Sequence, residues 1–109
     1  MKSIVFLGTS LKAIRSFPDD ARRQSGFQLE RVQHGVDPDD WKPMKTIGAG
    51  VREIRVNNRS GAYRTIYLAT QRDAVYVLHA FEKKKRTTPK MHIDLARMRL
   101  KVLVEDRRS

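Results

Sequence analysis

The sequence AYRTIYLATQRDAVYVLHAFEKKKRTTPK, residues 62–90, decides the fold and directs the search for function. It holds two hydrophobic runs separated by the polar turn QRD, and the second run leads into the basic residues 83–86 and Lys90. Two apolar runs joined by a short polar turn are typical of neighbouring β-strands. Like charges placed side by side repel one another unless an anion neutralises them. The stretch therefore predicts a sheet whose basic edge binds an anionic partner.

The length and the charge distribution narrow the class of protein. A chain of 109 residues can bury one hydrophobic core, so we expect a single domain over residues 1–109. The net charge is +11, yet residues 1–41 hold 6 basic and 6 acidic residues, which leaves 17 basic and 6 acidic residues for the rest. This asymmetry favours nucleic acid, an anionic membrane surface or an acidic protein as partner. The alternative is a solvated basic face that keeps the protein in solution.

Several chemistries lack support in the sequence. There is no cysteine, which excludes disulfides and a thiol nucleophile and suits the reducing cytoplasm. The apolar run near the N-terminus is too short for a signal peptide or a membrane span. No glycine-rich phosphate loop, serine triad or metal-ligand spacing is present, so we expect no cofactor and no metal.

The first half of the chain predicts a strand followed by a helical hairpin. Residues 3–7 form a short apolar run with β-branched side chains, and two amphipathic helices follow, the second one starting at Pro18 and ending at Gly35. Residues 36–43, with two prolines and three aspartates, predict a loop. Its Trp41 is expected to seal an edge of the core, with stacking on a base as the minor alternative. Residues 44–47 are then expected to begin a strand.

The second half predicts an antiparallel meander and a closing helix. Strands are expected at residues 51–56, 62–69 and 74–81, the last of them apolar enough for the centre of a sheet covered on both faces. In the first of these, either a bulge intervenes or Ile54 and Val56 face the core beside Arg52. In both cases Glu53 and Arg55 project together from the opposite face.

Two polar residues stand out within these strands. Arg64 shares a face with apolar residues, so we expect it to form a salt bridge or to point at a ligand. His79 lies inside the last strand, where a hydrogen-bonded core histidine is the more frequent case and a catalytic one the minor alternative.

Thr88 and Pro89 predict the start of a helix that runs to about residue 104, followed by a frayed tail at residues 105–109. This helix carries two apolar stripes on nearly opposite sides. One stripe can pack on the sheet, and the other is expected to need a partner. The first stripe comprises Met91, Leu95, Met98 and Val102, and the second Ile93, Ala96, Leu100, Leu103 and Val104.

Basic residues near one glutamate and one histidine suit a particular reaction. RNA is cut without a metal when its 2′-hydroxyl attacks the adjacent phosphorus, which gives a 2′,3′-cyclic phosphate and a free 5′-hydroxyl. Arginine matches the phosphate oxygens with its planar fork and stabilises the charge that develops there. Histidine, glutamate or a lysine with a lowered pKa can transfer the protons, and crowding of Lys83, Lys84 and Lys85 is one cause of such lowering.

Five short motifs, in order, resemble the RelE/ParE superfamily of toxins from type II toxin-antitoxin systems, and in particular its phage-related HigB-type branch. They are E-I-R at residues 53–55, G-A-Y-R at 61–64, F-E-K-K at 81–84, T-P at 88–89 and A-R-M-R at 96–99. The resemblance covers residues 44–99 and implies an α+β fold like that of the microbial ribonucleases. It also implies a cytoplasmic, ribosome-dependent mRNA endoribonuclease (an mRNA interferase) that inhibits translation.

The resemblance further assigns roles to residues and implies partners. Arg55 and Arg64 match phosphate-stabilising positions, Lys84 with Lys83 matches an electrostatic or acid position, and His92 is a candidate for proton transfer. The tyrosine that some members use after the basic cluster is missing, so the general base is His92, Glu53 or a lysine. RNA binding is expected from a basic set that comprises Lys45, Lys83, Lys85, Arg86 and Lys90. The implied partners are the ribosome, mRNA and a cognate antitoxin of the helix-turn-helix class.

Two other functions remain open at this point. A ParE-like protein would poison a topoisomerase by binding and cut no RNA, but such relatives generally lack the basic set after Phe81. A noncatalytic RNA-binding module would be expected to carry exposed aromatic residues for base stacking, and the sequence shows no such motif.

Overall fold

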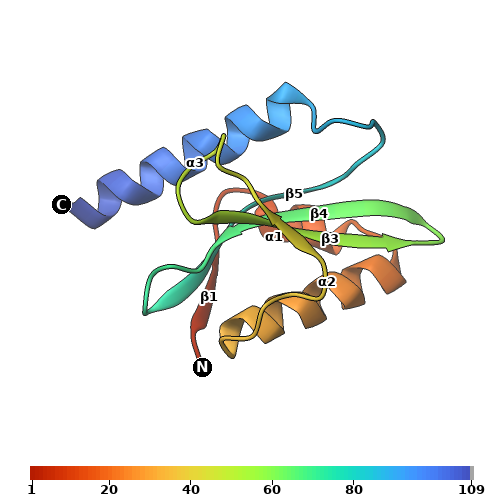
Figure 1. The fold of residues 1–109 in the computed structure, drawn as a ribbon, viewed down its shortest axis with the longest axis horizontal. Helices are drawn as coiled ribbons and strands as arrows, with labels where there is room; N and C mark the ends of the chain where they lie inside the picture. The colour runs from red at the N-terminus through yellow and green to blue at the C-terminus, as the bar shows by residue number, and fades with distance from the viewer. Residues whose placement is uncertain (109) are drawn as a thin grey trace.

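The computed structural model describes residues 1–108, which form a five-stranded sheet and three helices (Figure 1). The elements follow one another as β1 (Ser3–Phe6), α1 (Ser10–Arg15), α2 (Asp19–Gln33), β2 (Trp41–Pro43), β3 (Val51–Asn58), β4 (Gly61–Leu68), β5 (Ala74–Glu82) and α3 (Lys90–Arg108). The α+β class, the helical hairpin, the meander and the closing helix are confirmed, and the arrangement is compatible with a RelE-like fold.

The strands lie in the order β1-β5-β4-β3-β2. β1 pairs with β5 in parallel, and the other neighbours are antiparallel. β5 therefore has a strand on each side, and every residue from Ala74 to Phe81 is buried. The apolar run is therefore an interior strand covered on both faces, as expected, although β4 is the middle strand of the five.

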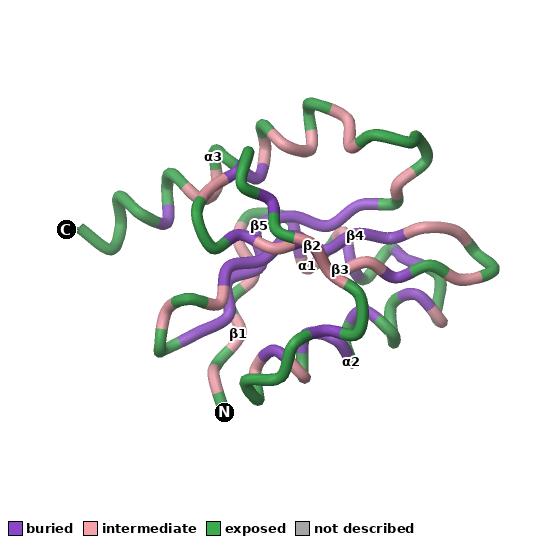
Figure 2. The backbone as a smooth tube through the Cα atoms, in the orientation of Figure 1, coloured by how far each residue is buried: buried purple, intermediate pink, exposed green. Residues whose placement is uncertain are grey.

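Helices cover both faces of the sheet and create two cores. The hairpin α1–α2 packs on one face, where Ile14, Leu29 and Ile54 belong to one cluster of buried residues. α3 crosses the other face, where Ile66, Leu78 and Leu103 belong to a second cluster (Figures 1 and 2). Ile54 and Val56 lie in the hairpin core without a bulge in β3, so Val51, Glu53 and Arg55 face α3.

A register shift in β5 changes which side chains meet α3. Ile66 pairs with His79 but Tyr67 pairs with Val77, so Leu78 has no partner in β4. Strict alternation after Val77 would place His79 and Phe81 on the hairpin face. The extra residue instead turns both rings toward α3, where they stack with His92.

Two expectations about the middle of the chain are wrong. Residues 36–43 are not entirely loop, because Trp41–Pro43 form the edge strand β2 and Trp41 pairs with Ile54 of β3. Residues 44–47 form a turn rather than a strand, since the amide nitrogens of Ile47 and Gly48 both donate to the carbonyl oxygen of Met44. An edge strand tolerates Pro43, which has no N–H to donate.

The closing helix is longer than expected. It continues to Arg108, so residues 105–108 are helical rather than frayed, and the end of the expected tail, Ser109, lies outside the described residues. Nη1 of Arg107 lies 3.3 Å from Oδ2 of Asp73, the residue before β5, and helps hold this last turn. Of the two apolar stripes, the one containing Ala96 and Leu103 packs on the sheet. The other is largely exposed, with Met91, Met98 and Val102 more than half accessible to solvent.

The adjacent residues Leu103 and Val102 provide a matched test of this packing. Leu103→Ala empties a buried position and should lower the free energy of unfolding by about 2–3 kcal/mol, whereas Val102→Ala on the exposed stripe should change it by less than about 0.5 kcal/mol. Urea denaturation followed by circular dichroism measures both. Equal losses for the two variants would contradict the orientation of α3.

Candidate active site

A buried ion pair marks the α3 face of the sheet. Glu53 is fully buried, and its Oε1 lies 3.7 Å from Nε of Arg64 on the neighbouring strand and 4.0 Å from Nζ of Lys42 on β2. Arg64 is itself 5 % exposed. Burying two charges costs several kcal/mol per ion unless each finds a partner, so the two residues depend on one another. The salt bridge expected for Arg64 is therefore present, and Glu53 is its partner.

The hydrogen bonds of this cluster are incomplete. Nη1 of Arg64 donates to Oδ1 of Asn57 at 2.9 Å and to the carbonyl oxygen of Tyr63 at 3.0 Å. Both carboxylate oxygens of Glu53 and the Nε atoms of Arg55 and Arg64 are buried without a hydrogen-bond partner. Burial lowers the pKa of Arg64, Glu53 opposes that effect, and the nearby charge of Arg55 lowers the pKa further. The Nε atoms of the two guanidinium groups thus have neither a hydrogen-bond partner nor contact with solvent.

A basic groove opens beside this cluster. It lies between residues 42–46 and residues 83–88, has a volume of about 620 Å³, and its charged lining consists of Lys42, Lys45, Lys83 and Arg86. No acidic residue contributes to the lining. Burial is the main cause that lowers the pKa of Lys83, and the charge of Arg64 adds to it. A groove with four cations and no anion is suited to a polyanion.

The structure brings some of the predicted site residues together and leaves others apart. Glu53, Arg55, Arg64 and Lys83 influence one another electrostatically, while Lys45 and Arg86 line the groove. Lys84, Lys85 and Lys90 are exposed and do not contribute to the groove lining. Sequence reasoning missed Lys42, which faces Glu53 in the register of β2 and β3. The sequence did not predict a role for Lys42, because a strand of three residues among prolines and aspartates is too short to show a recognisable period.

Two histidines and one phenylalanine form a stack between the sheet and α3: His79 and Phe81 of β5, and His92 of α3. Nε2 of His79 lies 2.7 Å from Nδ1 of His92, and the ring of Phe81 stacks on His92 with centroids 4.0 Å apart. Arg99 donates from Nη1 to the carbonyl oxygen of Leu78 and approaches Nδ1 of His79 at 3.4 Å. Burial, followed by His92 and Arg99, lowers the pKa of His79 to about 4. Burial also lowers the pKa of His92.

Phe81 connects the stack to the buried ion pair. Phe81 of β5 is the register partner of Arg64 in β4, and its ring stacks on the ring of His92. Phe81 is therefore a neighbour of both Arg64 and His92. His79, a minor candidate from the sequence, lies two residue pairs along the register from the pair of Arg64 and Phe81. The bulge at Leu78 produces this arrangement, and the sequence carries no pattern that predicts the bulge.

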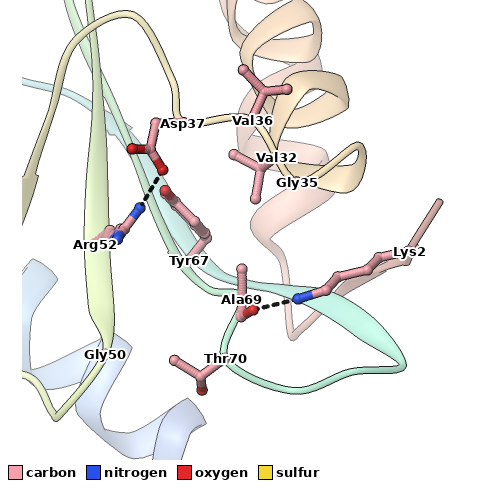
Figure 3. A pocket seen from close by; sticks show the side chains of 10 residues that line it. All are labelled: Lys2, Val32, Gly35, Val36, Asp37, Gly50, Arg52, Tyr67, Ala69 and Thr70. Atoms are coloured by element: carbon pink, nitrogen blue, oxygen red, sulfur yellow. Dashed lines mark hydrogen bonds and ion pairs between the residues drawn. The ribbon is translucent and has the colours of Figure 1, made fainter.

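A second hollow lies on the hairpin side of the sheet, with a volume of about 300 Å³ (Figure 3). Its charged side chains already have protein partners. Arg52 donates to Asp37 at 3.0 Å, and Nζ of Lys2 donates to the carbonyl oxygen of Ala69, as the dashed lines in Figure 3 mark. Because its cations are paired, this hollow is less suited to a phosphate than the basic groove.

The chain is a small α+β protein with a basic groove between residues 42–46 and residues 83–88. Residues 12–101 match the family described as Phage derived protein Gp49-like (DUF891), and the chain belongs to this family. The family is toxin-like and related to RelE, and membership implies a cognate antitoxin as a partner. A search among curated proteins finds no match. Within residues 1–108, no helix is long and apolar enough to cross a membrane.

The buried pair is tested by Glu53→Gln, with Glu30→Gln on the exposed side of α2 as the control. Removing the carboxylate leaves Arg64 buried without its countercharge, so the free energy of unfolding should fall by about 3 kcal/mol, while the control should change it by less than about 0.5 kcal/mol. Chemical denaturation at neutral pH measures the difference. A Glu53→Gln protein as stable as the wild type would show that the pair does not hold these strands.

Stability should depend on His79 at acidic pH. The unfolded chain binds a proton at this histidine near pH 6.5, whereas the folded protein does so only near pH 4. The contribution of neutral His79 is therefore fully present above pH 6.5 and is lost as the pH falls toward 4, by about 3 kcal/mol. His79→Phe should remove this part of the acid sensitivity, and His34→Gln, at the exposed end of α2, should retain it. Denaturation curves at pH 7.5 and 4.5 measure the difference, and equal acid losses in wild type and His79→Phe would contradict the prediction.

Proposed function

We propose that this protein is the toxin of a type II toxin-antitoxin system, of the HigB-type branch, and that it cuts mRNA in a ribosome-dependent, metal-independent reaction. The single observation that carries the proposal is the basic groove beside the buried guanidinium of Arg64. Four cations line the groove without an acid, which suits the backbone of RNA. Family membership supports the assignment as a toxin with a cognate antitoxin. The cleavage of mRNA is our inference.

Arg64 is assigned to the scissile phosphate. Its fork is held by Glu53, Asn57 and the carbonyl oxygen of Tyr63, so its orientation is fixed before a ligand arrives. A preorganised donor stabilises the charge that develops on the phosphoryl oxygens without reorganisation during the reaction. Arg55 adds the positive charge of a second guanidinium close by. Glu53 acts as the anchor of Arg64 rather than as the base, because it is fully buried and already pairs with two cations.

The proton transfers are assigned to neighbouring lysines. Lys83 accepts the proton of the 2′-hydroxyl, because its lowered pKa makes the neutral amine more accessible. The 2′-oxygen forms a bond to phosphorus and the bond between phosphorus and the 5′-oxygen breaks. The ammonium of Lys84, exposed just beyond β5, protonates the departing 5′-oxygen. Solvent then restores both lysines to their starting protonation states.

The remaining basic residues serve binding. Lys42, Lys45 and Arg86 line the groove and hold the mRNA backbone on either side of the cut. Lys85 and Lys90 are exposed outside the groove and contact ribosomal RNA through charge. We expect the cognate antitoxin to be a helix-turn-helix protein, as in the HigB-type relatives that the sequence resembles.

Primer extension on mRNA from cells that express the protein tests the assignment. The wild type should give codon-positioned 3′ ends. Arg64→Lys keeps the charge beside Glu53 but loses the planar fork, so cleavage should fall about 100-fold. Lys83→Met removes the base and should reduce cleavage by about 100-fold or more. Lys12→Met, on the exposed side of α1, removes the same charge away from the groove and should retain cleavage.

Other outcomes separate the competing functions. Cleavage that survives Arg64→Ala together with Lys84→Ala would overturn the site. DNA damage with intact mRNA would point to a topoisomerase poison. Binding of RNA without any cut would point to a noncatalytic module.

A further inference from the structure

The contact between the two histidines of the stack constrains which of their nitrogens carry hydrogen. Nε2 of His79 and Nδ1 of His92 are 2.7 Å apart, so one of them donates a hydrogen bond and the other accepts it. A neutral imidazole carries one N–H and one acceptor nitrogen. The direction of this bond therefore fixes the tautomer of both rings.

Arg99 determines which of the two histidines donates this hydrogen bond. Its Nη1 approaches Nδ1 of His79 at 3.4 Å, and a guanidinium has donors only. An N–H on Nδ1 of His79 would point at these donors, so Nδ1 keeps its lone pair and the hydrogen lies on Nε2. Nε2 of His79 then donates to Nδ1 of His92. His92 consequently carries its own hydrogen on Nε2, which makes no hydrogen bond within residues 1–108.

The surroundings hold Arg99 in this position. Nη1 donates to the carbonyl oxygen of Leu78 at 2.9 Å, and Nη2 donates to Oγ1 of Thr9 at 3.0 Å. Gly8 has a φ of +54°, and a Cβ there would lie 2.5 Å from Nε of Arg99. The loop before α1 thus supplies both the space and an acceptor for the guanidinium.

The contacts of the stack disfavour an additional proton on either histidine. A proton on Nδ1 of His92 would meet the N–H of His79, and a proton on Nδ1 of His79 would meet Arg99. The groups that face His79 are His92 and Arg99 from α3, and Phe81 from its own strand. None of them is an anion that would stabilise an additional positive charge.

We propose that Arg99 and His79 are positioning residues that fix His92 as the Nε2–H tautomer, so that His92 donates a hydrogen bond in the active site and does not act as the general base. The part of this inference that concerns catalysis rests on the proposed function. The donated bond is assigned to an oxygen of the phosphoryl group, because His92 stacks on Phe81, which is the register partner of Arg64. The assignment removes His92 from the candidates for the base and leaves that role to Lys83.

Long-range proton–nitrogen NMR of the nitrogen-15-labelled protein at pH 7.5 tests the tautomers directly. We expect both His79 and His92 to show a protonated Nε2 and an unprotonated Nδ1, each as a single form. His34, exposed at the end of α2, provides the reference signals of a histidine outside the stack. A protonated Nδ1 on His79 or His92 in the wild type would overturn the proposal.

Variants of Arg99 test whether this residue selects the tautomers of the two histidines. Arg99→Met removes the group that selects the tautomer, so the single pattern should be lost and both rings should give averaged or doubled signals. Arg99→Lys keeps a donor and should restore the single pattern. Arg97→Met is the matched control, because it removes the same charge from the same helix while its guanidinium binds the carbonyl oxygen of Thr46 instead. Unchanged ring signals in a folded Arg99→Met protein would contradict the role of Arg99.

The NMR result is independent of any activity. If the expected tautomers are found in a protein that does not cut RNA, the proposed function fails and the ring assignment stands. If a protein that cuts mRNA carries hydrogen on Nδ1 of His92, the positioning role fails and the proposed function stands.

Discussion

The ion pair between Glu53 and Arg64 is the constraint on which the rest of the site depends. A buried carboxylate beside a buried guanidinium stabilises a fold less than well-packed apolar residues commonly do, and losing one partner is costly. Here the pair lies on the face of the sheet that α3 covers, next to a groove lined only by cations among its charged residues. Its effect is to hold a guanidinium fork in place at the edge of a hydrophobic core.

The second determinant of the site is the bulge in β5. One unpaired residue, Leu78, turns His79 and Phe81 from the hairpin side to the α3 side, where they meet His92. The same interior strand thus supplies two rings of the histidine stack and leads directly into Lys83. The register of β5 therefore determines where the side chain of His79 lies, because a sheet without the bulge would bury His79 among the residues of the hairpin core.

Much of the fold followed from local patterns in the sequence. Apolar runs, turn residues and the T-P start placed three strands of the meander and all three helices, and alternation in residues 51–56 put Glu53 and Arg55 on one face. The edge strand Trp41–Pro43 was missed because three residues carry no period and prolines suggest a loop. The partners of Arg64, the bulge and the contact between His79 and His92 depend on register and tertiary packing, which periodicity does not reveal.

We propose that this face of the sheet promotes attack by the 2′-hydroxyl of mRNA. The most direct test is cleavage of a ribosome-bound mRNA by the purified toxin, with a single 2′-deoxy substitution at the nucleotide before the cut. The account predicts that the unmodified mRNA yields a 2′,3′-cyclic phosphate and a 5′-hydroxyl, and that the substitution abolishes cleavage at that position. Cleavage of the substituted mRNA at the same position, or products with a 3′-hydroxyl, would contradict it.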